Sequence, residues 1–171
     1  MKRGFTVTEL MVTIALIGAL AGVAIPVIGG FRESANQASC VNQLRALGVA
    51  MEGYLTDHGG FFPEMKMGRK SKGGGENVLE KVLLPYVGGP EDFRCPADHE
   101  DFQKTGCSYF WNHHASGMRK SRVVMFGMDS NHSQIPLIHD KEAYHGDENG
   151  TNFLFMDLSA GKDPDFQIES K

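Results

Sequence analysis

The feature that most constrains this chain is an apolar run close to its N-terminus. No charged residue occurs from Leu10 to Phe31, where Leu, Ile, Val and Met are spaced by Ala and Gly. An uncharged run of about 20 residues matches the thickness of the hydrocarbon core of a bilayer. A core helix of a soluble protein would show a polar face, which this run lacks, and a cleaved secretory signal would have a shorter apolar region. The run therefore predicts a transmembrane helix.

Two cations, Lys2 and Arg3, precede the run and set its expected orientation. Because the cationic flanks of membrane helices stay in the cytoplasm, the N-terminus is expected inside and the chain beyond about residue 31 outside. Glu9 lies near the start of the run, and a carboxylate at the centre of a bilayer costs about 2.5–3.5 kcal/mol. Glu9 is therefore either a functional residue or shallow enough to reach the headgroups.

Residues 2–10 read KRGFTVTEL and resemble the processing site of type IV pilins and type II secretion pseudopilins. In that family a dedicated peptidase cuts after the glycine and methylates the new N-terminal residue. The resemblance implies processing between Gly4 and Phe5. It also implies that Glu9 pairs with the amino group of Phe5 of a neighbouring subunit. Pro26 falls where many members carry a helix-bending proline, and it equally fits the end of the membrane span.

Beyond Gly29-Gly30 the sequence again shows helical periodicity. Apolar residues recur at steps of three and four along one stripe, formed by Cys40, Leu44, Leu47, Met51 and Tyr54. Glycines at 59 and 60 indicate the end of the helix. One helix over residues 5–58 would be about 80 Å long. Its first half would lie in the membrane, and its second half would carry a globular domain.

Three later segments are rich in β-branched and aromatic residues and predict strands at 108–111, 122–128 and 151–156, with a further short strand at 135–138. Residues 77–86 predict a short helix. The predicted fold class is α+β, a pilin fold with one long N-terminal helix, its first half transmembrane, packed on a small antiparallel sheet. The predicted organisation is a leader at 1–4, a transmembrane and assembly helix at 5–30, and an extracytoplasmic globular domain at 31–171 that includes the second half of the helix.

A second resemblance covers parts of the globular domain. Residues 54–63 look like the helix exit of the major pseudopilins. The segments 93–98, 108–109 and 145–157 resemble a large set of bacterial pilin-like proteins. That set often ends in a histidine, a short spacer and Asp-Gly, whereas this chain has a longer spacer and Asp157-Leu158.

The three cysteines are expected outside the cytoplasm, where disulfides can persist. Cys95 and Cys107 flank a short loop and are predicted to form a disulfide. Cys40 lies on the apolar stripe of the helix and is expected to be a buried thiol.

A calcium site is a further hypothesis, and no other cofactor is expected. Asp147, Glu148, Asn149 and Asp157 supply oxygen ligands of the kind that calcium takes. The major pseudopilins that this chain partly resembles hold calcium in a C-terminal loop. The alternative is a solvated acidic loop without metal.

Nucleic-acid binding is not expected. The net charge is −4, and the cations of the loop at 66–75 have no interleaved aromatic residues. No catalytic motif is present among the common hydrolase, metalloprotease and nucleotide-binding signatures, so an enzyme is not expected.

The predicted function is that of a structural protomer of a type IV pilus-like filament or a type II secretion pseudopilus. The alternative is a membrane-anchored minor or tip subunit that binds a ligand or DNA without polymerising. The resemblance implies a prepilin peptidase, other pilin-like subunits and an inner-membrane assembly platform as partners. It also implies a single-pass protein of the bacterial inner membrane, with its globular domain periplasmic or on a surface filament.

Overall fold

The computed structural model describes residues 6–123, 132–146 and 150–162. The chain divides into two compact units, residues 1–35 and 36–171, and helix α1 (Val7–Asp57) contributes to both. This helix has 51 residues and closely matches the predicted helix over 5–58.

In the first unit, α1 exposes its large apolar side chains. Seven of them are between 55% and 72% exposed, namely Leu10, Met11, Val12, Ile14, Leu16, Ile17 and Leu20. Among the described residues, no helix is both long enough and apolar enough to cross a membrane.

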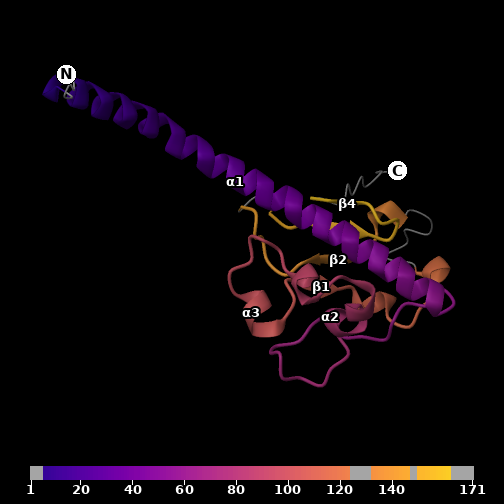
Figure 1. The fold of residues 1–171 in the computed structure, drawn as a ribbon. Coiled ribbons are helices and arrows are strands. Elements are labelled where there is room, and N and C mark those ends of the chain that lie inside the picture. The colour runs from indigo at the N-terminus through magenta and orange to yellow at the C-terminus, as the bar shows by residue number, and fades with distance from the viewer. Residues whose placement is uncertain (1–5, 124–131, 147–149, 163–171) are drawn as a thin grey trace. The chain divides into compact units, whose positions relative to one another are not determined.

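In the second unit, α1 buries one face against a four-stranded sheet, and Leu44, Leu47 and Met51 are fully buried there. The strands are β1 (Tyr109–Trp111), β2 (Pro136–Asp140), β3 (Phe153–Phe155) and β4 (Ala160–Gly161). They lie side by side in the order β1-β2-β3-β4, and each neighbouring pair is antiparallel. Figure 1 shows the second half of α1 running across this sheet. This part of the chain has the α+β, pilin-like arrangement expected from the sequence.

A glycine permits the close approach of α1 to the sheet. A Cβ atom at Gly48 would lie 3.1 Å from Leu154 Cδ1 and 3.4 Å from its Cδ2 atom. The shorter separation is tighter than ordinary van der Waals contact, so the absence of a side chain at Gly48 lets Leu154 of β3 pack closely on the helix.

Two glycines also end α1, as the sequence predicts. Gly59 and Gly60 have φ values of 65° and 81°, which lie in the left-handed region that favours glycine. Gly60 N donates to Leu55 O at 2.7 Å, and this bond satisfies a carbonyl of the last turn. The chain then reverses into Phe61, whose backbone pairs with Arg119.

The remaining elements are short. Among the described residues they are α2 (Leu79–Val82), α3 (Asp101–Thr105) and five 3-10 turns at Leu84–Tyr86, Pro90–Phe93, His113–Ala115, Lys120–Arg122 and His132–Gln134. The predicted helix over 77–86 is split into α2 and the first of these turns, because Pro85 lacks the N–H group that a continued helix needs.

The predicted strands at 108–111, 135–138 and 151–156 are confirmed as β1, β2 and β3, with shifted ends. The predicted strand at 122–128 lies mostly outside the described residues, and Arg122 itself belongs to a 3-10 turn. Helix α3 and strand β4 were not predicted, since five and two residues are too short to show a periodic pattern.

We expect the stability of the second unit to depend on the buried face of α1. The substitution Leu47→Ala should lower the free energy of unfolding by about 2–5 kcal/mol, because it removes a fully buried side chain and leaves a cavity. Val49 lies on the same helix but is 69% exposed, so Val49→Ala should change stability by less than about 0.5 kcal/mol. Urea unfolding of the full chain, followed by fluorescence of the single tryptophan Trp111, measures both. Equal effects of the two substitutions would contradict this packing.

Candidate functional site

The N-terminal segment contains the residues expected to be processed and to direct assembly. Gly4 and Phe5 lie outside the described residues. Glu9 lies in the first turn of α1, where its Oε2 atom accepts hydrogen bonds from Thr6 N at 2.9 Å and Thr6 Oγ1 at 2.7 Å. Glu9 N donates in return to Thr6 Oγ1 at 3.3 Å. The two residues thus form a reciprocal capping box at the start of the helix.

This capping role of Glu9 was missed from the sequence, although its signal is present there. Thr6 is followed three residues later by Glu9, directly before the apolar run, which is the sequence pattern of a capping box. A carboxylate in the first turn is also favoured by the positive end of the helix dipole. Glu9 is exposed, so its carboxylate remains open to a further partner.

Pro26 lies within α1, which continues without interruption to Asp57. The helix therefore does not end at this proline. The side chains of residues 23–28 are not described, and a bend at Pro26 remains a prediction from the resemblance.

A second candidate site is a buried cluster in the globular unit. It brings together Cys40 of α1, Cys95 after the turn Pro90–Phe93, and His145 in the segment after β2. The two Sγ atoms and one imidazole nitrogen all lie within 4.8 Å of one another. All three residues are buried, with no more than 5% of any of them exposed.

The carboxylate of Asp140 also contacts this cluster. Cys95 Sγ lies 3.2 Å from His145 Nε2. Cys40 Sγ lies 3.2 Å from Asp140 Oδ1, at the end of β2, and 3.6 Å from the Tyr109 hydroxyl on β1. Thiol, imidazole and carboxylate groups therefore meet in the interior between α1 and the sheet.

Asp140 is oriented by its neighbour Asn152. The Oδ2 atom of Asp140 accepts hydrogen bonds from Asn152 N at 2.8 Å and Asn152 Nδ2 at 2.9 Å. These bonds hold the other oxygen, Oδ1, toward Cys40. Among the described residues, His145 Nδ1 and Asn152 Oδ1 are buried without a hydrogen-bond partner.

Burial and mutual contacts shift the ionisation of the cluster. The hydrogen bond from Cys40, assisted by one from His145, lowers the pKa of Cys95 to about 5. The same bond to Cys95, together with burial, raises the pKa of Cys40. Burial raises the pKa of Asp140 to about 6. Burial would lower the pKa of His145, but its contact with Cys95 outweighs burial and raises it. The pKa values of the two thiols are therefore shifted in opposite directions, downward for Cys95 and upward for Cys40.

The predicted disulfide between Cys95 and Cys107 is not formed in the structure. Cys40, Cys95 and Cys107 are all buried free thiols. Cys95 Sγ faces the cluster, whereas Cys107 Sγ donates to Tyr109 O at 3.4 Å. Burial raises the pKa of Cys107 to about 12, which keeps this thiol protonated. The expectation that Cys40 is a buried thiol agrees with the structure.

The loop that carries Cys95 is tied to β1 by Asp98. The Oδ1 atom of Asp98 accepts from Glu100 N and Asp101 N, both at 2.8 Å. Its Oδ2 atom accepts from Phe102 N at 2.8 Å and from Ser108 Oγ at 2.5 Å. Ser108 Oγ in turn accepts from Cys95 N at 3.0 Å, so one buried carboxylate fixes both ends of this loop.

The four calcium candidates are mostly beyond the described chain. Asp147, Glu148 and Asn149 lie outside the described residues. Asp157 is exposed, and its Oδ1 atom accepts hydrogen bonds from Ser159 N and Ser159 Oγ. The calcium hypothesis therefore stays a prediction.

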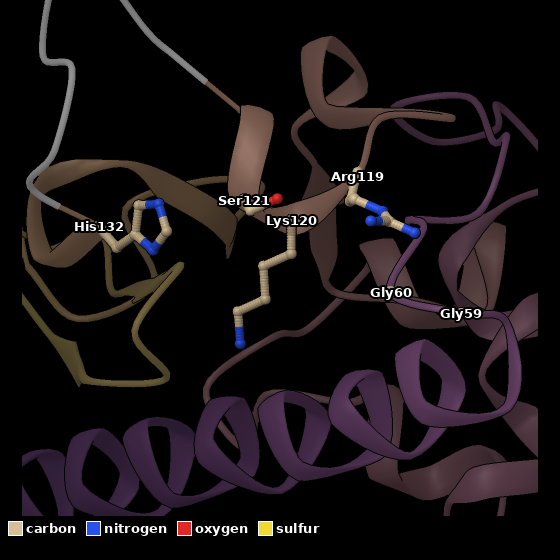
Figure 2. Close-up of a pocket in the computed structure, with 6 residues that line it drawn as sticks. All are labelled: Gly59, Gly60, Arg119, Lys120, Ser121 and His132. Atoms are coloured by element: carbon tan, nitrogen blue, oxygen red, sulfur yellow. The ribbon is translucent and has the colours of Figure 1, made fainter.

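A surface hollow of about 450 Å3 lies beside the end of α1 and is lined by Gly59, Gly60, Arg119, Lys120, Ser121 and His132. Figure 2 shows Lys120 extending from its turn toward α1. Its ammonium group forms an ion pair with Glu52 on that helix. Arg119 lies over the ring of Phe61, 5.1 Å from the ring centre. Lys120 is thus paired with a carboxylate, whereas Arg119 packs on an aromatic ring.

Two cations of the loop at 66–75 also have structural roles. Arg69 forms a buried ion pair with Glu80 at 2.7 Å and donates from Nε to Thr105 O, also at 2.7 Å. Lys66 forms an ion pair with Glu76 at 3.1 Å. The charge of Arg69 is therefore buried and paired, whereas the Lys66–Glu76 pair lies at the surface.

We expect Asp98→Asn to destabilise the folded chain by about 2 kcal/mol, since an amide cannot accept all four hydrogen bonds of the carboxylate. Burial would raise the pKa of Asp98, but its hydrogen bonds outweigh burial and hold the pKa below its ordinary value of 3.8. The stabilisation is therefore fully present above pH 3.8 and is lost as the pH falls through the lower pKa of the folded state.

Urea unfolding at several pH values tests this expectation. The difference in free energy of unfolding between the wild type and Asp98→Asn should shrink below about pH 4. Glu100→Gln is the matched control, because the side chain of Glu100 forms an exposed ion pair with Lys104. This substitution should change the free energy of unfolding by less than about 0.5 kcal/mol. A difference that stays constant from pH 7 to pH 3 would count against the role given to the carboxylate.

Parts of this chain are similar in sequence to known proteins. The prokaryotic N-terminal methylation motif matches residues 1–25. Type II secretion system core protein G of Escherichia coli (strain K12) is 36% identical over 84 residues, which make up 49% of this chain and 53% of the relative. The protein of the same name from Pectobacterium carotovorum subsp. carotovorum is 33% identical over 97 residues, or 57% of this chain and 55% of the relative.

Type IV major pilin protein PilA of Myxococcus xanthus (strain DK1622) is 38% identical over 56 residues, or 33% of this chain and 26% of the relative. The chain thus spans about half the length of the core protein G relatives and less of the pilin. No solved structure matches it. The resemblance seen in residues 2–10 is confirmed: the chain carries a prepilin-type N-terminus and is homologous, over the matched part, to type II secretion pseudopilins and type IV pilins.

Proposed function

We propose that this chain is a structural protomer of a type IV pilus-like or type II secretion pseudopilus filament, processed after Gly4 by a prepilin peptidase. The observation that carries the proposal is the continuity of α1. The methylation motif at residues 1–25 overlaps the start of a helix of 51 residues, Val7–Asp57, and the second part of that helix is built into an α+β domain. Such a helix provides one segment for assembly and another for holding a globular domain.

The first segment of α1 needs an apolar environment. Its side chains from Leu10 to Leu20 are largely exposed, and large exposed apolar surfaces mark contacts with membranes or other proteins. Before assembly this environment is the inner membrane, with the N-terminus cytoplasmic and the globular domain periplasmic. In the filament it is the apolar surface of neighbouring helices. A Cβ atom added at Gly18 or Gly22 would meet nothing within 4 Å, and small residues of this kind let helices approach closely.

In this proposal Glu9 has two roles, as part of the N-terminal cap of α1 and as a contact between subunits of the filament. In the single chain its carboxylate is held by Thr6. After processing, Phe5 carries a new amino group, and the resemblance to pilins supports a pair between this group of one subunit and Glu9 of the next. Pairing the two charges lowers the cost of burying each among apolar helices. The partners of the protomer are then the peptidase, other pilin-like subunits and an inner-membrane assembly platform, and no enzymatic role is proposed.

We expect the protein isolated from its native membrane to lack Met1 to Gly4 and to carry one added methyl group on Phe5. Intact-mass measurement, followed by sequencing of the N-terminal peptide, checks both changes. A strain without the prepilin peptidase should yield the full-length chain. Full-length protein in the presence of an active peptidase would rule out the proposed processing.

We expect Glu9→Gln to reduce incorporation into filaments by at least about tenfold, because the neutral amide cannot pair with a buried amino group. Glu33→Gln is the matched control, since Glu33 is an exposed glutamate of the same helix outside the apolar run. Sheared-filament fractions compared with membrane fractions measure incorporation at equal expression. If both variants and the wild type stay in the membrane without forming filaments, the chain is instead a membrane-anchored binding subunit.

A further inference from the structure

We propose that Cys40, Cys95 and His145 bind one thiophilic divalent cation of the zinc type, with Asp140 as the fourth ligand. The proposal begins with the origin of these residues. They come from α1, from the segment after the turn Pro90–Phe93, from the end of β2 and from the segment that follows β2. Three of these parts place two thiols and an imidazole within 4.8 Å of one another, and the end of β2 places the carboxylate of Asp140 3.2 Å from the thiol of Cys40.

The separations fit a tetrahedral site. Zinc binds sulfur at about 2.3 Å and nitrogen or oxygen at about 2.0–2.2 Å, so the ligand atoms of a tetrahedral site lie about 3.3–3.8 Å apart. Cys95 Sγ and His145 Nε2 are 3.2 Å apart, and the three donor atoms are all within 4.8 Å of one another. Cys40 Sγ and Asp140 Oδ1 are 3.2 Å apart. Each of these two 3.2 Å pairs would separate by a few tenths of an ångström to reach the distances of a zinc site.

The donor set selects the class of metal. Two sulfur donors with an imidazole and a carboxylate suit zinc, whereas calcium takes six to eight oxygen ligands. The proposed site is therefore chemically distinct from the calcium site predicted at Asp147, Glu148, Asn149 and Asp157. Each of the two hypotheses can fail without affecting the other.

The surroundings of the cluster resemble those of bound metals. Metal-binding carboxylates are usually held by a hydrogen bond to their second oxygen. Asn152 provides this contact twice, from its backbone N and its Nδ2, to Asp140 Oδ2.

A disulfide between Cys40 and Cys95 is the main competing arrangement. Forming it releases two protons and two electrons, and an external oxidant must accept the electrons. It would also remove the sulfur partner of His145 and leave the imidazole buried beside a neutral disulfide. The two free thiols and the short contact to His145 favour the metal. Both arrangements can be distinguished on the folded wild type.

The first test is titration of the reduced, chelator-treated full chain with Co2+, which reports its coordination by visible absorption. We expect one equivalent to bind with the intense bands of a tetrahedral thiolate site, and Zn2+ to displace it. Zn2+ should raise the melting temperature, EDTA should reverse the rise, and Ca2+ should not displace Co2+. X-ray absorption of the zinc-loaded wild type should show two sulfur ligands. Failure to bind Co2+ or Zn2+, with all three thiols free, would overturn the proposal.

Variants separate the ligands from the third cysteine. His145→Gln and Cys95→Ser should each weaken Zn2+ binding by about 10-fold or more. Cys107→Ser is the matched control, because Cys107 is buried but contacts the backbone of Tyr109 rather than the cluster. This variant should bind Zn2+ as tightly as the wild type does. If the ligand variants do not fold, the visible and X-ray absorption spectra of the wild type decide whether the metal is bound by two sulfur ligands. A non-reduced protein from the native membrane that is lighter by two hydrogens, with Cys40 and Cys95 in one cross-linked peptide, would establish the disulfide and refute the metal site.

Discussion

The globular unit depends on burying one face of α1 against a sheet that is itself very small. The strands have between two and five residues, so the ladder supplies few backbone hydrogen bonds. Leu44, Leu47 and Met51 are fully buried on the helix, and Leu154 of β3 lies against Gly48. Because the hydrophobic effect scales with the apolar area removed from water, the helix surface is the main source of stability that such a sheet has available.

A small sheet leaves much of the chain in turns, and buried carboxylates hold these turns in place. Asp98 joins the segment after Cys95 to Ser108, directly before β1. Asp140 joins the end of β2 to Asn152, next to β3. A buried carboxylate is stable only when hydrogen bonds replace its lost hydration. Backbone N–H groups serve this purpose at both sites, so each aspartate determines the path of the chain around it.

The sequence predicts the helix well because periodicity is a local property. The apolar stripe from Cys40 to Tyr54 and the glycines after Asp57 locate the second half of α1 without any knowledge of its partners. The capping box of Thr6 and Glu9 is equally local, and its pattern could have been read from the sequence. Helix α3 and strand β4 have too few residues for a period to be visible.

The buried cluster could not be predicted in the same way, because its members are far apart in the sequence. Cys95 and Cys107 are twelve positions apart and suggested a disulfide, yet Cys95 faces Cys40 and His145 instead. The partial resemblance at residues 93–98, 108–109 and 145–157 did contain the relevant residues. It gave no reason for their co-occurrence, which the structure supplies: Asp98 and Ser108 position the segment of Cys95, and that segment meets His145.

The two parts of α1 place opposite demands on one continuous helix. In the proposed filament the first part must exchange a membrane for neighbouring helices, so its apolar side chains have to stay accessible. The second part must remain fixed to its own sheet while that exchange takes place, since a helix that loosened from the domain would leave the domain behind. A metal bound by Cys40 of α1, Cys95 and His145 would join the helix directly to two segments of the domain. Because ligands that bind only the folded state stabilise it, such a metal would strengthen the attachment where the short strands contribute least.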